Sequence, residues 1–546
     1  MKNRLKLLSL AVLATVMCSV SAVGQTSPTP PDNSKYILTP PAPDTPRINS
    51  ARVFGVRPKA EFRYTIAATG VRPMTFSAEG LPKGLKLDPE SGIITGTLRK
   101  AGTYHVTLRA ANSLGEATRD LRIVVGEDIL LTPPMGWNSW NCWGSAVSQE
   151  KVYSSAKAMV DKGLVNYGWT YINIDDGWQG VRGGKYHAIQ PNAKFPDIKG
   201  LVDELHSMGL KAGIYSAPWV ATYQGHIGTQ CDNPEGKYEW IEKGVCDEYF
   251  KVKDPNGKLH SGYFRYHGAY SFAEADAKQW ADWGIDYLKY DWNPNDYYYT
   301  KEMADALRAT GRDIALSISG SDPFALAHSW RELTQCWRTT DDIFDTWKSI
   351  MRIGFGPQDR WPAFSGPGHW ADADMLVVGM VGWGPNLHYT RLTPDEQYTH
   401  ISLWSLFSSP MLIGCDIAQM DDFTLSLLCN NEVNDIMQDP LGMRAVPYFR
   451  GEGYVVYVKI LENGNLAVGL FNTSSEPMKI GFTPRTLGLW SKEITVRDVW
   501  RQKDVAKIGP RDRYEEEIAP HGASLLIVSP PNTMEKIVNK PYVIEQ

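Results

Sequence analysis

The sequence predicts a multidomain protein in which a (β/α)8 TIM barrel is flanked by an N-terminal immunoglobulin-like β-sandwich and a C-terminal antiparallel β-sandwich. Three observations support this fold class. The chain has 546 residues, more than one ordinary domain needs. Its middle part alternates apolar, strand-like runs with segments of helical period. Both flanking parts instead carry short alternating strands separated by Gly and Pro.

Composition narrows the function classes. With 56 basic and 61 acidic residues, the net charge is -5 and no basic stripe stands out. This pattern excludes a nucleic-acid-binding protein and a polybasic membrane patch. The chain has no CxxC and no histidine cluster, so we expect neither a zinc site nor another cofactor.

The first 24 residues have the order of a secretory signal peptide. Basic residues precede an apolar run over 7–20, and small residues follow over 21–24. An uncleaved membrane anchor is the alternative, but the apolar run is shorter than the roughly 20 residues that a span needs. We therefore expect an exported protein, periplasmic or on or outside a bacterial cell, with no transmembrane segment in the mature chain.

An oxidising compartment would permit disulfides, because six cysteines remain after the leader. The spacing assigns no connectivity. The six are Cys142, Cys231, Cys246, Cys336, Cys415 and Cys429.

The regions on either side of the barrel are divided by their composition and by their strand pattern. Residues 25–47 are rich in Pro, Ser and Thr and are predicted to form an extended linker. Residues 48–127 show short alternating strands, and the run GLPKGLKLDPESGIITGTLRKAGTYHVTLRAANSLGEA resembles the immunoglobulin-like modules attached to secreted bacterial enzymes. From 443 to 546 the alternating strand pattern returns, which predicts a second β-sandwich.

Residues 128–442 carry the barrel pattern. Eight apolar runs separated by helical segments fit a closed barrel better than a doubly wound sheet, and no GxGxxG opens the first helix. The predicted strands are 135–140, 171–175, 211–216, 286–290, 313–319, 336–340, 374–379 and 410–415.

Chemically capable side chains lie at successive predicted strand ends. In a barrel these ends converge on one mouth, so the sequence predicts an acidic pocket with basic groups and aromatic walls. The residues are Trp140, Asp175, Asp176, Tyr215, Lys289, Asp291, Arg338, Asp342 and Asp374.

Such a mouth suits glycoside hydrolysis, in which one carboxylate attacks the sugar and another carboxyl protonates the departing oxygen. In YLKYD, Lys289 and Asp291 face the lumen together while Tyr290 points outward. The ammonium is expected to lower the pKa of Asp291 and keep this nucleophile ionised. Asp342 is the candidate acid and base, and its neighbour Asp341 is expected to raise its pKa.

Each candidate also has a purely structural interpretation. Asp342 could be a helix N-cap, and Asp175 with Asp176 could bind a divalent metal or form a turn. Trp140 and Tyr215 could simply pack the barrel interior. Convergence of several strand ends on one mouth favours a site, and none of these alternatives explains it.

The ordered motifs resemble glycoside hydrolase family 27, the family of α-galactosidases and α-N-acetylgalactosaminidases. They are PPMGWNSWNCWG, NIDDGW, LKAGIYS, WGIDYLKYD, WRTTDDI and ADADMLVVG. The resemblance implies a retaining exo-glycosidase that removes terminal α-galactose from oligo- or polysaccharides, with Asp291 as nucleophile and Asp342 as acid and base.

The resemblance also implies how the sugar is bound. Trp140 would form a hydrophobic wall, and Asp175 and Asp176 would accept hydrogen bonds from the 4- and 6-hydroxyls of a galactose-configured ring. The residues that would complete this subsite are Tyr215, Lys289, Arg338 and Asp374.

Two departures from the family pattern bear on this expectation. Gly177 and Asn293 stand where the family commonly has cysteines, so the usual local disulfides are not expected. Ser319 stands at or near a glutamate that binds the 2-hydroxyl in many α-galactosidases, which resembles the acetylgalactosaminidase pattern, and Asp322 could supply the missing carboxylate. An α-N-acetylgalactosaminidase, a β-L-arabinopyranosidase and a non-catalytic carbohydrate-binding protein are therefore the alternatives.

Overall fold

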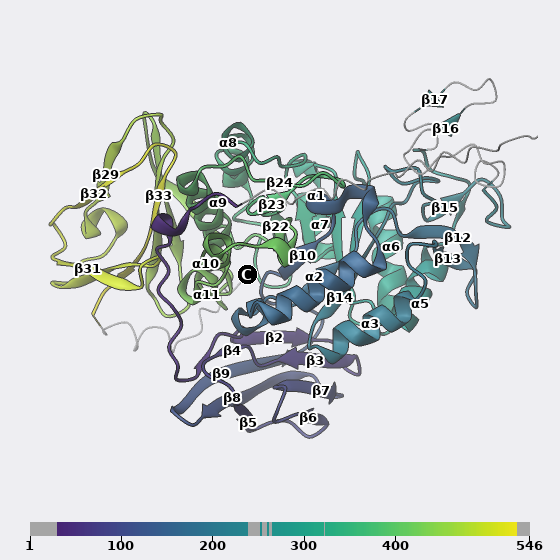
Figure 1. The fold of residues 1–546 in the computed structure, drawn as a ribbon, viewed down its shortest axis with the longest axis horizontal. Helices are drawn as coiled ribbons and strands as arrows, with labels where there is room; N and C mark the ends of the chain where they lie inside the picture. The colour runs from purple at the N-terminus through teal and green to yellow at the C-terminus, as the bar shows by residue number, and fades with distance from the viewer. Residues whose placement is uncertain (1–29, 239–251, 254–258, 261–264, 322, 532–546) are drawn as a thin grey trace, which may run out of the picture.

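The computed structural model describes residues 30–238, 252–253, 259–260, 265–321 and 323–531. A β-rich module, a central barrel and a β-sandwich follow one another along the chain (Figure 1). The predicted fold class is confirmed. The predicted signal peptide, residues 1–24, lies outside the described residues. Within them, no helix is long and apolar enough to cross a membrane.

The barrel is one eight-stranded sheet in which every paired strand runs parallel to its neighbour. The first and last strands in sequence pair with each other, and a bridge from Leu376 to Ile413 joins the remaining gap. In chain order the strands are β10 (Met135–Asn138), β11 (Tyr171–Asn173), β14 (Lys211–Ser216), β19 (Tyr287–Asp291), β20 (Ala315–Ser319), β21 (Cys336–Arg338), β22 (Trp370–Asp372) and β25 (Met411–Ile413).

Helices cover the outside of this sheet and connect its strands (Figure 1). Side chains that cap helix N-termini mark several starts, for example Asp197 before α3 and Thr393 before α9. The main helices are α2 (Gln149–Asp161), α3 (Ile198–Ser207), α5 (Ala273–Trp283), α6 (Tyr297–Ala309), α7 (Ala327–Leu333), α8 (Trp347–Gly354) and α9 (Pro394–Leu406).

The seventh strand differs from the prediction. It was expected over 374–379 but lies at β22, just before that range. Asp374 has a left-handed backbone, with φ of 79°, and its N–H donates to Asp372 Oδ1 at 2.7 Å. This turn ends the strand, because a left-handed residue cannot continue a β conformation. Asp374 therefore follows strand seven instead of beginning it.

The barrel interior is layered. Near the amino ends of the strands, apolar side chains form a closed floor, which consists of Tyr171, Tyr287, Ala315, Cys336 and Trp370. Above the floor the inward positions become polar. On β19, for example, Tyr287 belongs to the floor. Lys289 and Asp291 lie two and four residues nearer the carboxyl end and face the same way. The alternation of this one strand therefore supplies both the floor and the reactive groups.

The N-terminal module is a two-sheet sandwich with its own core. One sheet has the order β2-β9-β8-β5 and the other β3-β7-β6. The strands are β2 (Val53–Val56), β3 (Glu61–Thr65), β5 (Thr75–Glu79), β6 (Leu85–Leu87), β7 (Ile93–Thr97), β8 (Gly102–Asn112) and β9 (Gly115–Val125).

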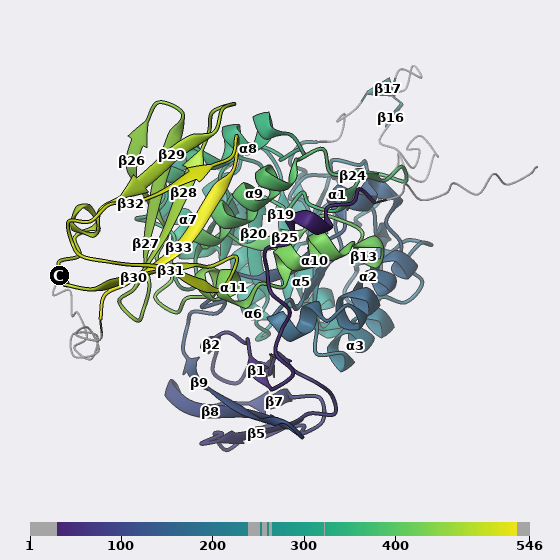
Figure 2. The same cartoon turned by 60° about the vertical axis from the view of Figure 1, so that its left-hand side comes forward.

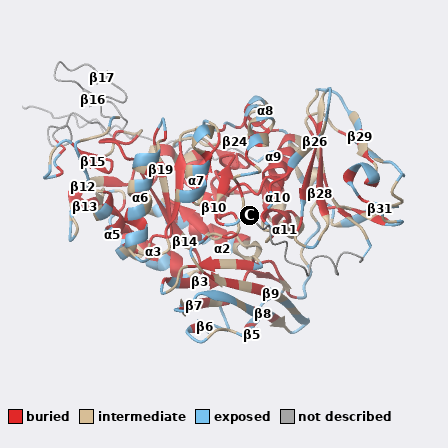
Figure 3. Ribbon diagram, turned by 180° about the vertical axis from the view of Figure 1, so that it is seen from behind, coloured by how far each residue is buried: buried red, intermediate tan, exposed pale blue. Residues whose placement is uncertain are grey.

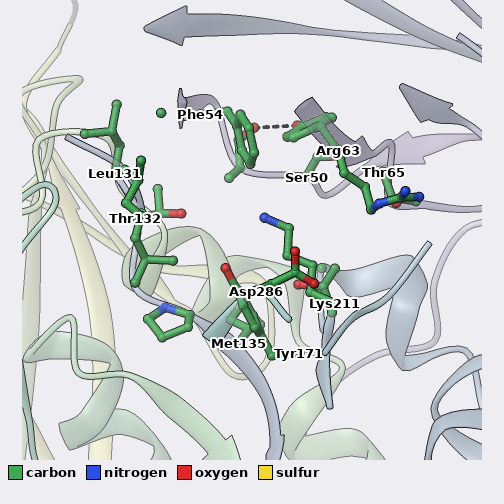
Figure 4. Close-up of a pocket in the computed structure, with 18 of the residues that line it drawn as sticks. Ser50, Phe54, Arg63, Thr65, Leu131, Thr132, Met135, Tyr171, Lys211 and Asp286 are labelled. Atoms are coloured by element: carbon green, nitrogen blue, oxygen red, sulfur yellow. Dashed lines mark hydrogen bonds between the residues drawn. The ribbon is translucent and has the colours of Figure 1, made fainter. Parts of the chain in front are cut away.

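This module packs against the amino-terminal face of the barrel, opposite the strand ends predicted to carry the site (Figures 1 and 4). A pocket of about 130 Å³ remains between them. In it, the ammonium of Lys211 lies over the rings of Phe54, at 4.8 Å, and Tyr171, at 5.4 Å. Arg57 pairs with Asp313 at 2.6 Å across the same interface. The module is thus docked by charged and aromatic contacts.

The segment preceding the module is not the extended linker that was predicted. Residues 30–46 run along the barrel (Figure 2), and Tyr36, Ile37 and Leu38 pack against its core. The Tyr398 hydroxyl donates to Tyr36 O at 2.7 Å and accepts from Leu38 N at 3.1 Å. The prediction rested on proline content and overlooked this apolar triplet, which anchors the segment to α9.

The C-terminal sandwich packs on α9, whose residues Glu396–Leu406 are all buried (Figure 3). One face of a six-stranded sheet packs against this helix, and a two-stranded sheet covers the other face of that six-stranded sheet. The strands are β26 (Val446–Gly451), β27 (Tyr454–Ile460), β28 (Leu466–Asn472), β29 (Met478–Phe482), β30 (Ile494–Asp498), β31 (Lys503–Ile508), β32 (Tyr514–Ile518) and β33 (Ala523–Ser529).

The described cysteines form no disulfide. Cys231 donates through Sγ to Lys237 O at 3.3 Å. Cys246 lies outside the described residues. The other described cysteines are Cys142, Cys336, Cys415 and Cys429, all with free thiols.

Candidate active site

A cavity of about 500 Å³ opens at the carboxyl ends of the barrel strands. The structure brings together there nine of the ten residues predicted to form the site, and the exception is Ser319. The nine are Trp140, Asp175, Asp176, Tyr215, Lys289, Asp291, Arg338, Asp342 and Asp374. Their convergence follows from the parallel barrel, since each lies at or shortly after the carboxyl end of a barrel strand.

Asp291 ends β19 and lines the cavity. Its Oδ2 accepts a hydrogen bond from the Tyr215 hydroxyl at 3.0 Å. Burial raises the pKa of Asp291 to about 6; Lys289 lowers it, but Asp342 and Asp175 raise it further. The expectation of a lowered pKa is therefore wrong in direction, because burial and two neighbouring carboxylates outweigh the single ammonium.

Lys289 makes its ion pair with a different carboxylate. Its Nζ lies 2.8 Å from Asp175 Oδ2, and both side chains are largely buried. Burial opposes the charge on Lys289, yet Asp175 and Asp291 outweigh this effect and raise its pKa. Asp175 is fixed further by its own N–H, which donates to Ser139 Oγ at 3.0 Å. Lys289 therefore joins two strand ends and holds Asp175 toward the cavity.

Asp176 is held by hydrogen-bond donors from the loop after β14. Thr222 Oγ1 donates to one carboxylate oxygen and Gln224 N to the other, each at 2.9 Å. Burial nevertheless raises its pKa to about 7. With Asp175 paired to Lys289, this arrangement does not resemble a metal site. No group of three or more His, Cys, Asp or Glu in the described part of the chain could hold a metal ion.

Asp342 lies on the loop after β21, and its side chain is 70% exposed toward the cavity mouth. Arg338 Nη2 lies 3.1 Å from its Oδ1. Burial raises the pKa of Asp342, but Arg338 and Lys289 outweigh it, so the pKa is lowered. The predicted increase is wrong because Asp341 turns away to pair with Arg352 at 2.8 Å.

Asp342 is not a helix cap either. The next helix, α8, begins five residues later at Trp347 and is capped by Thr346, whose hydroxyl accepts from Ser349 N. The Asp342 carboxylate is therefore free of that structural task. Its exposure at the mouth leaves it accessible to a bound ligand.

Asp374 fixes the loop that carries Asp342. Its Oδ1 lies 2.9 Å from Arg338 Nη1, and its Oδ2 accepts from Ile343 N at 2.7 Å. Arg338 thus bridges Asp374 and Asp342 with its two terminal nitrogens. The left-handed backbone at Asp374, which Asp adopts more readily than most residues, lets one carboxylate contact both Arg338 and Ile343 N.

Ser319 lies deeper than predicted. It is buried at the end of β20, and its Oγ is 3.5 Å from Arg338 Nη1. The next residues, Gly320 and Ser321, line the cavity in its place. Asp322, the suggested replacement for a missing carboxylate, lies outside the described residues.

Sequence reasoning missed several residues that line the cavity mouth. Tyr223 and Arg265 stack, with the guanidinium 4.7 Å from the ring centre. Phe344 and Trp383 form a second aromatic pair, with ring centres 5.5 Å apart. All four lie in loops without periodic pattern, so no spacing signal marks them. For Phe344, its place two residues after Asp342 was the available hint.

The site therefore joins two carboxyl groups in contrasting surroundings within one cavity. Asp291 is buried and hydrogen-bonded, whereas Asp342 stands at the mouth beside an arginine. Such a pair can attack an electrophilic carbon from one side and exchange a proton with the leaving group on the other. The arrangement suits hydrolysis of a glycosidic bond.

Comparison with known proteins agrees with this chemistry. The family described as Alpha galactosidase A matches residues 132–245 and 253–439, and its C-terminal β-sandwich family matches 451–528. A family of Ig domains matches residues 22–126. Together these matches cover the module, the barrel and the sandwich.

Individual relatives and solved structures of glycoside hydrolases are also similar to this chain. An α-galactosidase from Cyamopsis tetragonoloba is 34% identical over 73% of this chain and 86% of its own. A candidate α-galactosidase from Bacteroides fragilis has a TM-score of 0.75 at 33% identity, covering 89% of this chain and 98% of that one. A β-L-arabinopyranosidase of family 27 from Geobacillus stearothermophilus has a TM-score of 0.62 at 28% identity, covering 74% and 97%. The chain belongs to the α-galactosidase family of glycoside hydrolases, glycoside hydrolase family 27.

Proposed function

We propose that the protein is an exo-acting α-galactosidase that cleaves terminal α-galactosides with retention of configuration. The observation that carries this proposal is the placement of Asp291 and Asp342 on one cavity that Asp175 and Asp176 also line. Relatives named α-galactosidases share about a third of their residues with this chain.

In the first step the Asp291 carboxylate attacks the anomeric carbon as the glycosidic C–O bond breaks. Asp342 gives its proton to the departing oxygen, so the leaving group departs as a neutral alcohol. In the second step Asp342 takes a proton from water, whose oxygen attacks the same carbon and displaces Asp291. Two inversions give net retention, and both carboxyl groups return to their starting protonation states.

The carboxylates that line the cavity support the proposal that the terminal sugar is a hexose of galactose configuration. Asp175 and Asp176 would accept hydrogen bonds from the 4- and 6-hydroxyls, and their fixed geometry makes this recognition specific. Trp140 would provide the apolar wall, while Lys289, Arg338 and Asp374 hold the carboxylates in place. Ser319 would act on the 2-position indirectly, through Arg338.

A β-L-arabinopyranosidase is the second candidate, because a solved member of the family with that activity shares this fold. Arabinopyranose lacks the hydroxymethyl group that Asp176 would bind. Purified protein should therefore hydrolyse nitrophenyl α-galactoside with higher kcat/KM than nitrophenyl β-L-arabinopyranoside or nitrophenyl N-acetyl-α-galactosaminide. A reversed order for either competitor would contradict the proposed sugar.

The two catalytic pKa values predict the pH dependence of kcat/KM. Between the two pKa values the pair holds one proton, mostly on Asp291; the reactive form is the minor one, with Asp342 protonated and Asp291 ionised. Below the lower pKa both carboxyls are protonated and no nucleophile remains; above about pH 6 both are ionised and no acid remains. We expect a bell-shaped profile whose alkaline side falls about tenfold per pH unit above about 6.

The acid limb should lie below the ordinary aspartate pKa, because Arg338 lowers the pKa of Asp342. The control is Asp342→Asn assayed with dinitrophenyl α-galactoside, whose leaving group needs no acid. That variant should lose the alkaline limb and keep only a rise with pH as Asp291 ionises. An alkaline limb at or above pH 8 in the wild type would contradict the assigned pair.

A further inference from the structure

Two aromatic rings stand beside Asp342 at the mouth of the cavity. Phe344 is 49% exposed, and its ring centre lies 5.5 Å from that of Trp383, with the planes tilted by 37°. Both rings line the same cavity as the two catalytic aspartates. A single exposed aromatic residue needs no explanation, but two adjoining rings next to a catalytic group do.

The position of these rings follows from the chemistry of Asp342. If Asp342 protonates the departing oxygen, the group attached to that oxygen must leave past the residues around Asp342. Phe344 is two residues away on the same loop, and Trp383 lies against it. The rings therefore flank the leaving group, whereas Asp175 and Asp176 lie on the side of the terminal sugar.

The rings are held in place by a dedicated set of contacts. Asp345, fully buried, follows Phe344 and accepts hydrogen bonds from Arg391 N at 2.9 Å and His388 Nε2 at 3.2 Å. His388 belongs to β24 (His388–Tyr389), which pairs with β23 (Met380–Val381) to form the hairpin that carries Trp383. One carboxylate thus ties the loop of Phe344 to the hairpin of Trp383.

The hairpin is also fixed to the segment after β10. Gly382 N and Trp383 N both donate to Asn141 O, at 2.9 and 3.1 Å, and Gly384 N donates to Cys142 O at 3.2 Å. Trp383 itself has a left-handed backbone, with φ of 51°. This conformation is unfavourable for a bulky residue and tends to persist where a site requires it.

We propose that Phe344 and Trp383 form an aglycone subsite that binds a second sugar ring, the one released from the galactose. The apolar face of a pyranose stacks on aromatic rings, and its edge carries hydroxyls. The adjoining ion pair of Asp341 and Arg352 supplies exposed acceptors and donors for those hydroxyls. This inference rests on the proposed function and adds which residues bind the sugar that is released from the galactose.

The test compares two substrates that share the terminal galactose and differ in the leaving group. Melibiose releases glucose, whereas methyl α-galactoside releases methanol and has no ring to stack. The readout is the ratio of kcat/KM for melibiose to kcat/KM for methyl α-galactoside. In Phe344→Ala this ratio should fall about fivefold, and in Phe344→Ala with Trp383→Ala about tenfold or more.

Trp490→Ala is the matched control, because Trp490 is 64% exposed on the C-terminal sandwich, away from the cavity. It should leave the ratio unchanged, and equal thermal midpoints would show that all variants fold. An unchanged ratio in both ring variants would overturn the aglycone subsite. If the wild-type protein hydrolysed neither galactoside, the proposed function itself would fail, a result visible without any variant.

Discussion

Asp291→Ala should lower kcat for nitrophenyl α-galactoside by about 10⁴-fold or more, because no other carboxylate of the site can replace the nucleophile. Asp175 is committed to Lys289, Asp176 to Thr222 and Gln224, and Asp342 is needed as the acid. Sodium azide should restore turnover by entering the vacated space. The product should be β-galactosyl azide, since a single displacement inverts the anomeric carbon.

Loss of activity should not reflect loss of folding. Asp291 is a buried carboxyl with a pKa raised to about 6, so its charge opposes folding at neutral pH. Asp291→Asn removes that charge and should unfold at an equal or higher temperature. Asp305→Asn, on the exposed face of α6, is a control that should retain full activity. Wild-type activity in Asp291→Ala would refute the nucleophile.

Asp342→Ala should show an effect that depends on the leaving group. Removing the acid should lower kcat/KM for melibiose by about 10²- to 10⁴-fold. Dinitrophenyl α-galactoside needs little protonation, so its kcat/KM should fall far less. The second step lacks its base, and the galactosyl-enzyme should therefore accumulate and give a burst of dinitrophenol.

Azide distinguishes the two aspartates. In Asp342→Ala it attacks the galactosyl-enzyme after one inversion, so the product should be α-galactosyl azide. In Asp291→Ala the product should be the β anomer. The same azide anomer from both variants, or equal losses for both leaving groups in Asp342→Ala, would contradict the assigned roles.

The fold was predictable because its signals are local and repeated. Eight apolar runs and their spacing indicated the barrel, and polar residues at the strand ends indicated the site. The same rule failed at strand seven, where a left-handed turn at Asp374 ends the strand before the range expected. A different rule, based on proline content, failed at residues 30–46, because it overlooked an apolar triplet that packs on the barrel.

The electrostatics of the site could not be predicted from spacing. Lys289 is two residues from Asp291 in sequence, yet its ion pair is with Asp175 on another strand. Asp341 is adjacent to Asp342, yet it pairs with Arg352. Both pKa expectations were therefore wrong in direction, because a pKa depends on burial and on neighbours that the sequence does not order in space.

The N-terminal module lies away from the cavity that carries Asp291 and Asp342. The module packs on the barrel floor, at the amino ends of the strands, while the cavity opens at their carboxyl ends. Its contacts include Arg57 with Asp313 and Lys211 with Phe54. A module docked in this way contributes to the barrel's stability without lining the cavity.

The anomeric configuration of the galactose first released shows directly whether Asp291 and Asp342 act by double displacement. A double displacement by Asp291 and Asp342 releases galactose first as the α anomer, which then mutarotates slowly. Proton NMR spectra recorded from the start of hydrolysis distinguish the two anomers. We expect the α-galactose signal to appear first; initial appearance of β-galactose would show a single inverting displacement and contradict the two roles.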